Sequence, residues 1–166
     1  MYHLLAIDPG AKGGLAVFDI VNSKVVYLAE LNPRPHFLMV EVLNKFKVYH
    51  VVMEKVHGRG GNSAQSNFSF GKNIGYLKSV IELKGLKIEE VEPQLWQSHV
   101  GVKQLKKLNS NFDTKFAAYK LCCDIFPDLK MQFKTQRGRL RDGITDACLI
   151  GHYYMKVHFD KINGNP

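Results

Sequence analysis

The chain has 166 residues, of which 45% are apolar and 23% are charged, a composition that suits one globular domain with a full core. No window approaches the roughly 20 continuous apolar residues of a membrane span, so a membrane-spanning protein is excluded. Strand-like sequence begins within a few residues of Met1 and leaves no room for a secretion signal. We therefore expect a cytoplasmic protein with one domain over residues 1–160 and a frayed tail over 161–166.

The first apolar run stops at Asp8, and a turn containing Pro9 and Gly10 separates it from a second apolar run. Strands are expected over residues 3–8, 14–20 and 24–31, as an antiparallel meander with short links. Asp8 should then lie at the rim of a buried sheet. Asp-Pro-Gly is also ordinary turn chemistry, so Asp8 becomes a catalytic candidate only if other carboxylates reach comparable positions.

A second carboxylate also stands at a strand end. After a helix marked by Phe37, Val40, Leu43 and Phe46, the apolar run 48–53 is typical of a central strand and ends in Glu54. The glycine-rich segment 57–63 is irregular and basic enough to contact phosphate. A long helix over 65–84 carries Gly71 and Gly75 on one face, where a close approach is possible.

The second half of the chain is predominantly helical and basic. A strand is expected over 86–91, a short helical segment with Trp96 after Pro93, a polar connection over 103–111, a helix over 113–125 and a mobile basic loop over 132–139. Between residues 103 and 141 there are ten Lys and Arg against three Asp, a concentration that indicates either a polyanion partner or a solvated basic face. The cysteines, Cys122, Cys123 and Cys148, fit neither a disulfide framework nor a metal pattern and are interpreted as free core thiols.

The last helix begins near Leu140 and places Asp142 and Asp146 one turn apart on the same side. Like charges at this spacing are unfavourable by a few tenths of a kcal/mol unless a positive charge lies between them. Together with Asp8 and Glu54, these acids form an all-oxygen set, which selects Mg²⁺ or Mn²⁺. A pair of such ions can hold the attacking water and the leaving oxygen in phosphodiester hydrolysis. The histidines are scattered and show no zinc spacing.

The ordered set of motifs resembles the RuvC-type Holliday junction resolvases of the ribonuclease H-like superfamily, especially their short phage and viral members. The matching pieces are Ala6–Gly10, Gly13–Ala16, Val52–Glu54, Phe68–Gly75, Pro93–Trp96, Lys115–Pro127 and Asp142–Ala147. The resemblance implies an α/β ribonuclease H-like fold. Its mixed five-stranded sheet would combine an antiparallel meander with parallel strands and be flanked by helices.

The resemblance further implies a crossover junction endodeoxyribonuclease of DNA recombination and repair, which depends on Mg²⁺. The enzyme would act on four-way junctions as a homodimer. It would be located in the cytoplasm, or in the host cytoplasm if a phage encodes it. Asp8, Glu54, Asp142 and Asp146 would be its catalytic, metal-binding acids. Bacterial members space the last two acids by three residues, whereas Gly143 occupies that place here.

The position of their aromatic wedge is His57, with Phe68 and Phe70 as alternatives that are more typical of core residues. Lys103, Lys106 and Lys107 are candidates for assisting at the cleaved phosphate. DNA contacts are assigned to Lys12, His57, Arg59, Lys72, Lys103, Lys106, Lys107, Lys134, Arg137 and Arg139.

Other functions stay open at this point. The same acids could serve a nuclease of flaps or RNA–DNA hybrids, or the domain could bind junctions without cutting them. The turn at Asp8 and Gly10 also resembles the first phosphate loop of sugar kinases and actin-like ATPases. Those proteins need two such domains, and 166 residues hold one.

Overall fold

The computed structural model describes residues 1–10, 12–31, 34–57, 63–109 and 111–159. Its sheet has five strands in the order β3-β2-β1-β4-β5. The strands are β1 (His3–Asp8), β2 (Gly14–Asp19), β3 (Lys24–Glu30), β4 (Val48–Glu54) and β5 (Ile88–Val91). Strands β1 to β3 pair antiparallel, whereas β4 runs parallel to β1 and to β5. The predicted mixed sheet, with a meander followed by parallel strands, is confirmed.

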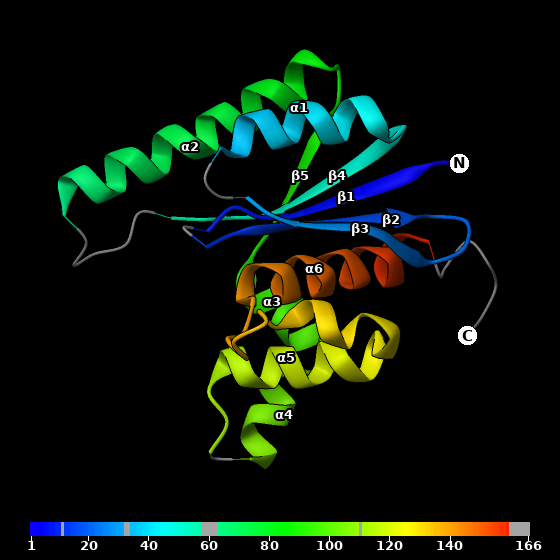
Figure 1. Ribbon diagram of the computed structural model, residues 1–166, viewed down its shortest axis with the longest axis vertical. Coiled ribbons are helices and arrows are strands. Elements are labelled where there is room, and N and C mark those ends of the chain that lie inside the picture. The colour runs from blue at the N-terminus through cyan, green and yellow to red at the C-terminus, as the bar shows by residue number, and fades with distance from the viewer. Residues whose placement is uncertain (11, 32–33, 58–62, 110, 160–166) are drawn as a thin grey trace.

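Helices cover both faces of this sheet (Figure 1). One face carries α1 (Pro35–Lys45) and α2 (Ala64–Leu83). The other carries α6 (Asp142–His158), with α3 (Pro93–Val100), α4 (Val102–Leu108), α5 (Thr114–Ile125) and the 3-10 helix η1 (Pro127–Phe133) behind it. The central strands are therefore enclosed on both sides.

Strand β1 separates two apolar cores because alternate side chains point to opposite faces. Leu5 and Ile7 pack with the α1 and α2 side, whereas Leu4 and Ala6 pack with α6. All four are fully buried. This alternation decides which face the terminal residue of each strand points to.

Two segments differ from the prediction. Residues 102–108 form helix α4 rather than an irregular connection, and η1 occupies part of the stretch expected to lack regular structure. The preceding helix α3 ends at Gly101, whose φ of 97° is left-handed, so the chain can turn and start a new helix at once. Leu105 of α4 also packs on the core, which provides an apolar anchor for an otherwise basic helix.

In helices α1 and α2, several apolar residues that the sequence pattern assigns to the core lie on the outer surface instead. In α1 the buried residues include Met39 and Val42, whereas Phe37 and Val40 are exposed. Phe68 of α2 is 68% exposed, so its interpretation as a core residue is wrong, while Phe70 is half-buried. These helices therefore present an apolar outer surface as well as an inner one.

Two inferences from composition agree with the structure. Cys122, Cys123 and Cys148 are buried and free, as expected for core thiols. Burial raises the pKa of the Cys122 thiol well above its usual value, which keeps it protonated. Among the described residues, no helix is both long and apolar enough to cross a membrane.

The N-terminus of α6 lies directly against the β1–β2 turn. Gly13 and Gly143 form an isolated parallel bridge, and a Cβ at Gly143 would lie 2.1 Å from the Lys12 carbonyl oxygen. A Cβ at Gly14 would meet the Gly143 carbonyl carbon at 2.6 Å. Backbone meets backbone here, so neither side can move aside for a side chain.

We expect Gly143→Ala to lower the free energy of unfolding by about 3 kcal/mol or more, because overpacking against backbone leaves no flexible atom to yield. In a chain of this length that is a fall in Tm of roughly 10 °C in a thermal melt. Gly71→Ala is the matched control, because a Cβ there meets nothing within 4 Å. The control should gain up to about 1 kcal/mol from helix propensity. Equal melting temperatures for the two variants would contradict the packing argument.

Candidate active site

Two carboxylates lie side by side at one edge of the sheet. Asp8 ends β1 and Glu54 ends β4, and the residues before them, Ile7 and Met53, are paired in the parallel ladder. Side chains two positions apart in a strand point to the same face of the sheet. Ala6, two positions before Asp8, and Val52, two positions before Glu54, both pack towards α6. Both carboxylates therefore stand on the face that α6 covers.

The first turns of α6 bring the other two acids to the same place. The Gly13–Gly143 contact fixes the start of the helix, so Asp142 and Asp146 project beside the ends of β1 and β4. Burial raises the pKa of Asp146 well above its usual value, and the charges of Asp8, Glu54 and Asp142 raise it further. Lys115 acts in the opposite direction. The structure thus brings the four predicted acids together around Asp146.

Each acid around Asp146 also has a fixed partner. The backbone N–H of Gly10 donates to Asp8 Oδ1 at 2.9 Å, and the indole Nε1–H of Trp96 donates to Glu54 Oε2 at 2.8 Å. Lys115 donates to Asp142 and forms an ion pair with it. The hydrogen bond to Asp142, with the further charges of Asp146 and Asp113, raises the pKa of Lys115. A buried indole and an ammonium thus hold two of the carboxylates.

The donor set fits a hard cation by its chemistry, because it is made of carboxylate oxygens held close to one another. The side-chain conformations do not form a finished site. Within the described ranges, no three His, Cys, Asp or Glu side chains are arranged to hold a metal ion. Glu54 and Asp142 instead point to Trp96 and Lys115. A cation bound here would therefore compete with these two contacts.

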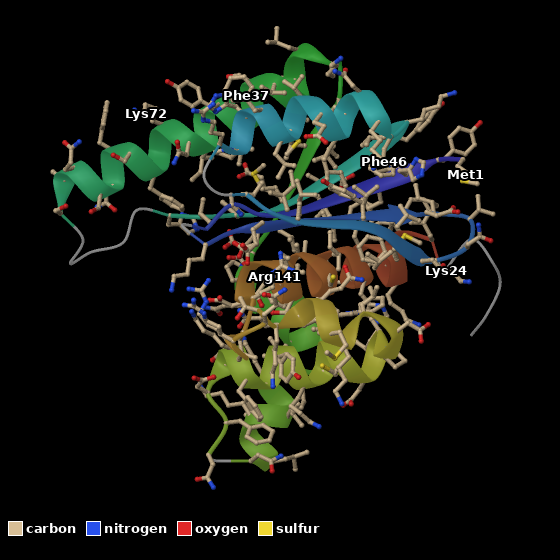
Figure 2. The ribbon with its side chains drawn as sticks, in the orientation of Figure 1. Met1, Lys24, Phe37, Phe46, Lys72 and Arg141 are labelled. Atoms are coloured by element: carbon tan, nitrogen blue, oxygen red, sulfur yellow. The ribbon has the colours of Figure 1, made fainter. Side chains whose placement is uncertain are left out.

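The basic residues expected to contact DNA lie on several elements. Lys12 is exposed on the β1–β2 turn, and His57 lies 3.5 Å from Glu92. Lys72 is exposed on α2, on the side away from the sheet (Figure 2). Lys103, Lys106 and Lys107 belong to α4, where Lys106 donates to Thr114 Oγ1 at 3.3 Å. Arg59 falls outside the described residues.

The turn after η1 leads directly into α6, whereas α4 lies farther from the sheet (Figure 1). Lys134 and Leu140 form an isolated bridge that closes this turn, with Gly138 at a φ of 77°. Lys134, Arg137 and Arg139 are exposed, with the Lys134 ammonium 4.7 Å from the Tyr119 ring centroid. Arg141 then donates to Glu30 of β3 at 2.9 Å and ties the turn to the sheet (Figure 2).

Sequence reasoning missed two residues that organise this site, Trp96 and Lys115. Lys115 was not among the basic candidates because it is 27 positions from its partner Asp142. Trp96 is the only tryptophan in the chain, a signal that could have singled it out, but nothing local indicates its link to Glu54. The departure at Gly143 was visible in the sequence but its reason was not: the backbone contact with the β1–β2 turn leaves no room for a side chain there.

The arrangement of strands, helices and acids can be compared with solved structures. Thermus thermophilus RuvC, in complex with a Holliday junction substrate, is 14% identical; the match covers 95% of this chain and 97% of that one, with a TM-score of 0.64. The chain has the ribonuclease H-like fold of RuvC. The fowlpox virus Holliday junction resolvase shares it at 15% identity, with 93% and 99% covered and a TM-score of 0.51. No family model matches the sequence, and no curated protein does.

We expect Asp146→Asn to raise the Tm of the metal-free protein at neutral pH by about 3 °C, the shift that roughly 1 kcal/mol produces in a chain of this length. Folding raises the pKa of Asp146. The free energy of unfolding of the wild type should therefore fall as the pH rises from the pKa of Asp146 in the unfolded chain to its higher pKa in the folded protein. Asn has no proton to lose, so the variant should lack this part of the pH dependence. Thermal melts in a chelator between about pH 4 and about pH 9 measure both effects. A lower Tm for the variant at neutral pH would contradict the expectation.

Proposed function

We propose that the chain is a metal-dependent, structure-selective endodeoxyribonuclease that resolves four-way DNA junctions by paired phosphodiester hydrolysis. The observation that carries the proposal is the convergence of Asp8, Glu54 and Asp142 on Asp146, which is itself half-buried. Such a cluster of like charges is unfavourable unless a cation neutralises it. The RuvC fold supports the choice of substrate, because both structural neighbours carry the name of a junction resolvase or its substrate.

The four acids would hold Mg²⁺, with Mn²⁺ as a substitute. The bound cation would activate water and stabilise the charge that develops on the cleaved phosphate. In the free protein Lys115 supplies part of the missing positive charge, through its contact with Asp142. Release of this contact on metal binding would leave the Lys115 ammonium beside the phosphate that is cut, where a positive charge stabilises the transition state. Lys115 thus joins Lys103, Lys106 and Lys107 as a candidate for that role.

The exposed cations of the 134–140 turn and of α4 would hold the DNA arms through phosphate contacts. Lys134, Arg137 and Arg139 belong to the turn that leads directly into α6, whose first turn carries Asp142. The α4 lysines lie farther from the sheet and would reach a more distant phosphate. Contacts of this kind fix the position of the duplex without reading its sequence.

Two symmetric cuts require two active sites, which a twofold homodimer provides. The outer surface of α1 and α2 offers an interface for a second copy. It carries Phe37, Val40 and Tyr76, which are between 41% and 61% exposed; we call them the α1–α2 patch. His36 links its two helices, since its ring contacts both Phe37 and Tyr76. Gly75 has open space beside it, which permits close approach of a partner helix.

We expect the wild type to cut a synthetic four-way junction in Mg²⁺ and Asp8→Asn to reduce the rate by at least about a hundredfold, because a ligand of the cation is lost. Labelled flaps and RNA–DNA hybrids, assayed in parallel, separate a resolvase from another ribonuclease H-like nuclease.

Asp124→Asn, at an exposed acid of α5, is the matched control and should cut like the wild type. Trp96 fluorescence gives a second readout, because its indole contacts Glu54 and should respond to Mg²⁺. Undiminished cutting by Asp8→Asn would end the proposal, and tight junction binding without cutting in Mg²⁺ or Mn²⁺ would indicate a binding module.

For the dimer, we expect Phe37→Glu to give particles of one chain, 18.9 kDa, in light scattering, because a charge in the patch would be buried without a partner. On a plasmid with an extruded cruciform, this variant should yield mainly nicked circles instead of the linear product of paired cuts. Val21→Glu is the control, since Val21 is 72% exposed on the β2–β3 turn, away from the patch. If the Phe37→Glu variant stays dimeric and gives as much linear product as the wild type, the dimer interface lies elsewhere.

A further inference from the structure

Two exposed tyrosines meet at the end of the sheet where β1 and β4 begin. The rings of Tyr2 and Tyr49 lie edge to face, with their centroids 4.5 Å apart and their planes at 88°. The two residues are 51% and 45% exposed. Tyr2 immediately precedes β1, so the length of this strand, about 20 Å, separates it from Asp8. Figure 1 shows the N-terminus and the start of α6 at opposite ends of the sheet, so the tyrosines are remote from the acids.

Exposed lysines accompany these rings. The Lys47 ammonium is 5.4 Å from the ring centroid of Tyr49 and 5.8 Å from that of Tyr2. A hydrogen bond with Tyr49 raises the pKa of Lys47, which secures its positive charge. The ammonium of Lys45, the last residue of α1, lies 4.9 Å from the Tyr27 ring centroid. We call Tyr2, Lys47 and Tyr49 the aromatic cluster, beside which Lys45 supplies a second exposed cation.

The backbone holds the aromatic cluster in place. The His3 N–H donates to the Lys47 carbonyl oxygen at 3.1 Å, which joins the start of β1 to the link before β4. The Ile20 N–H donates to the Tyr2 carbonyl oxygen at 3.0 Å, which ties Tyr2 to the end of β2. Asp19, which pairs with His3, is 4% exposed, and its carboxylate accepts hydrogen bonds from the β2–β3 turn. Its charge therefore leaves the lysines of this surface available for an anion.

The aromatic cluster has the two features with which proteins bind single-stranded DNA. Aromatic rings stack on unpaired bases of any sequence, and cations contact the phosphates between them. A paired duplex keeps its bases stacked inside, so it could use only the lysines. Lysine is depleted at the centres of protein–protein interfaces, so a protein partner fits this surface less well. An unpaired strand is the ligand that uses both the rings and the charges.

We propose that the aromatic cluster is a second DNA site, which binds one unpaired strand. Its bases would stack on Tyr2 and Tyr49, and its phosphates would contact Lys45 and Lys47. The site shares no residue with the acid cluster, and binding there does not depend on the proposed cleavage. Because about 20 Å separates the two places, the bases held here are remote from the phosphate that is cut. A junction with a single-stranded gap or tail would bind at both places, whereas a fully paired junction would not use the aromatic cluster.

The test is the affinity for a fluorescent oligothymidine of about 12 nucleotides, a length within the range of single-strand sites. Anisotropy is measured in a chelator at one fixed salt concentration, because phosphate binding depends on salt. Tyr2→Ala and Tyr49→Val should each weaken binding by about tenfold, since a base loses its aromatic partner. Val suits a strand, so the second change removes the ring without breaking β4. Tyr49→Phe is the matched control, because it keeps the ring and loses only the hydroxyl, and its affinity should stay within about twofold of the wild type.

Melting temperatures and affinity for a fully paired junction should match the wild type in all three variants, which separates a loss of stacking from a loss of folding. Unchanged oligothymidine binding by Tyr2→Ala and Tyr49→Val would overturn the inference, as would an equal loss in Tyr49→Phe. The inference also fails if a paired duplex of the same length, or polyglutamate, binds as tightly and is weakened by the same changes, since charge alone would then explain the binding. None of these measurements requires cutting, so their outcome is independent of whether the proposed cleavage holds.

Discussion

The site depends on one backbone contact, between the glycines of the β1–β2 turn and Gly143 at the start of α6. Because Gly13, Gly14 and Gly143 have no Cβ, the helix N-terminus can touch the turn directly. This contact sets where the first turns of α6 lie relative to the ends of β1 and β4. Asp142 and Asp146 reach Asp8 and Glu54 for this reason. An acid at position 143 would remove the contact that assembles the cluster.

The acid cluster is held against its own electrostatic repulsion. Burial and three neighbouring carboxylates raise the pKa of Asp146, and the Lys115 ammonium and the Trp96 indole each stabilise one of those neighbours. The packing of Trp96, which is 1% exposed in the α6-side core, fixes its N–H towards Glu54. Removing the charge at Asp146 would stabilise the fold and remove the proposed activity, as expected where stability is exchanged for function.

The sheet gives the molecule two faces with different proposed tasks. On one, α6 brings the acids to the strand ends, and the basic turn after η1 lies nearby (Figure 1). On the other, α1 and α2 carry the exposed α1–α2 patch. The turn that follows β1 reaches both faces, since the Gly10 N–H donates to Asp8 and Gly10 also lies against residues of α2.

The sequence by itself determined the strands and the position of Asp8 and Glu54 at strand ends, because apolar runs that stop at an acid are local patterns. The mixed topology followed from the resemblance to a known fold and not from any local pattern, since the parallel pairing of β4 with β1 and β5 joins segments far apart in the chain. The sequence also determined the spacing of Asp142 and Asp146, which follows from helix periodicity alone. Only the tertiary structure decided which partners these acids have. Trp96 and Lys115 reach Glu54 and Asp142 across 42 and 27 positions, and no local pattern records such a contact. The exposure of Phe37 and Phe68 was likewise decided by packing, because periodicity predicts a helix face and not what covers it.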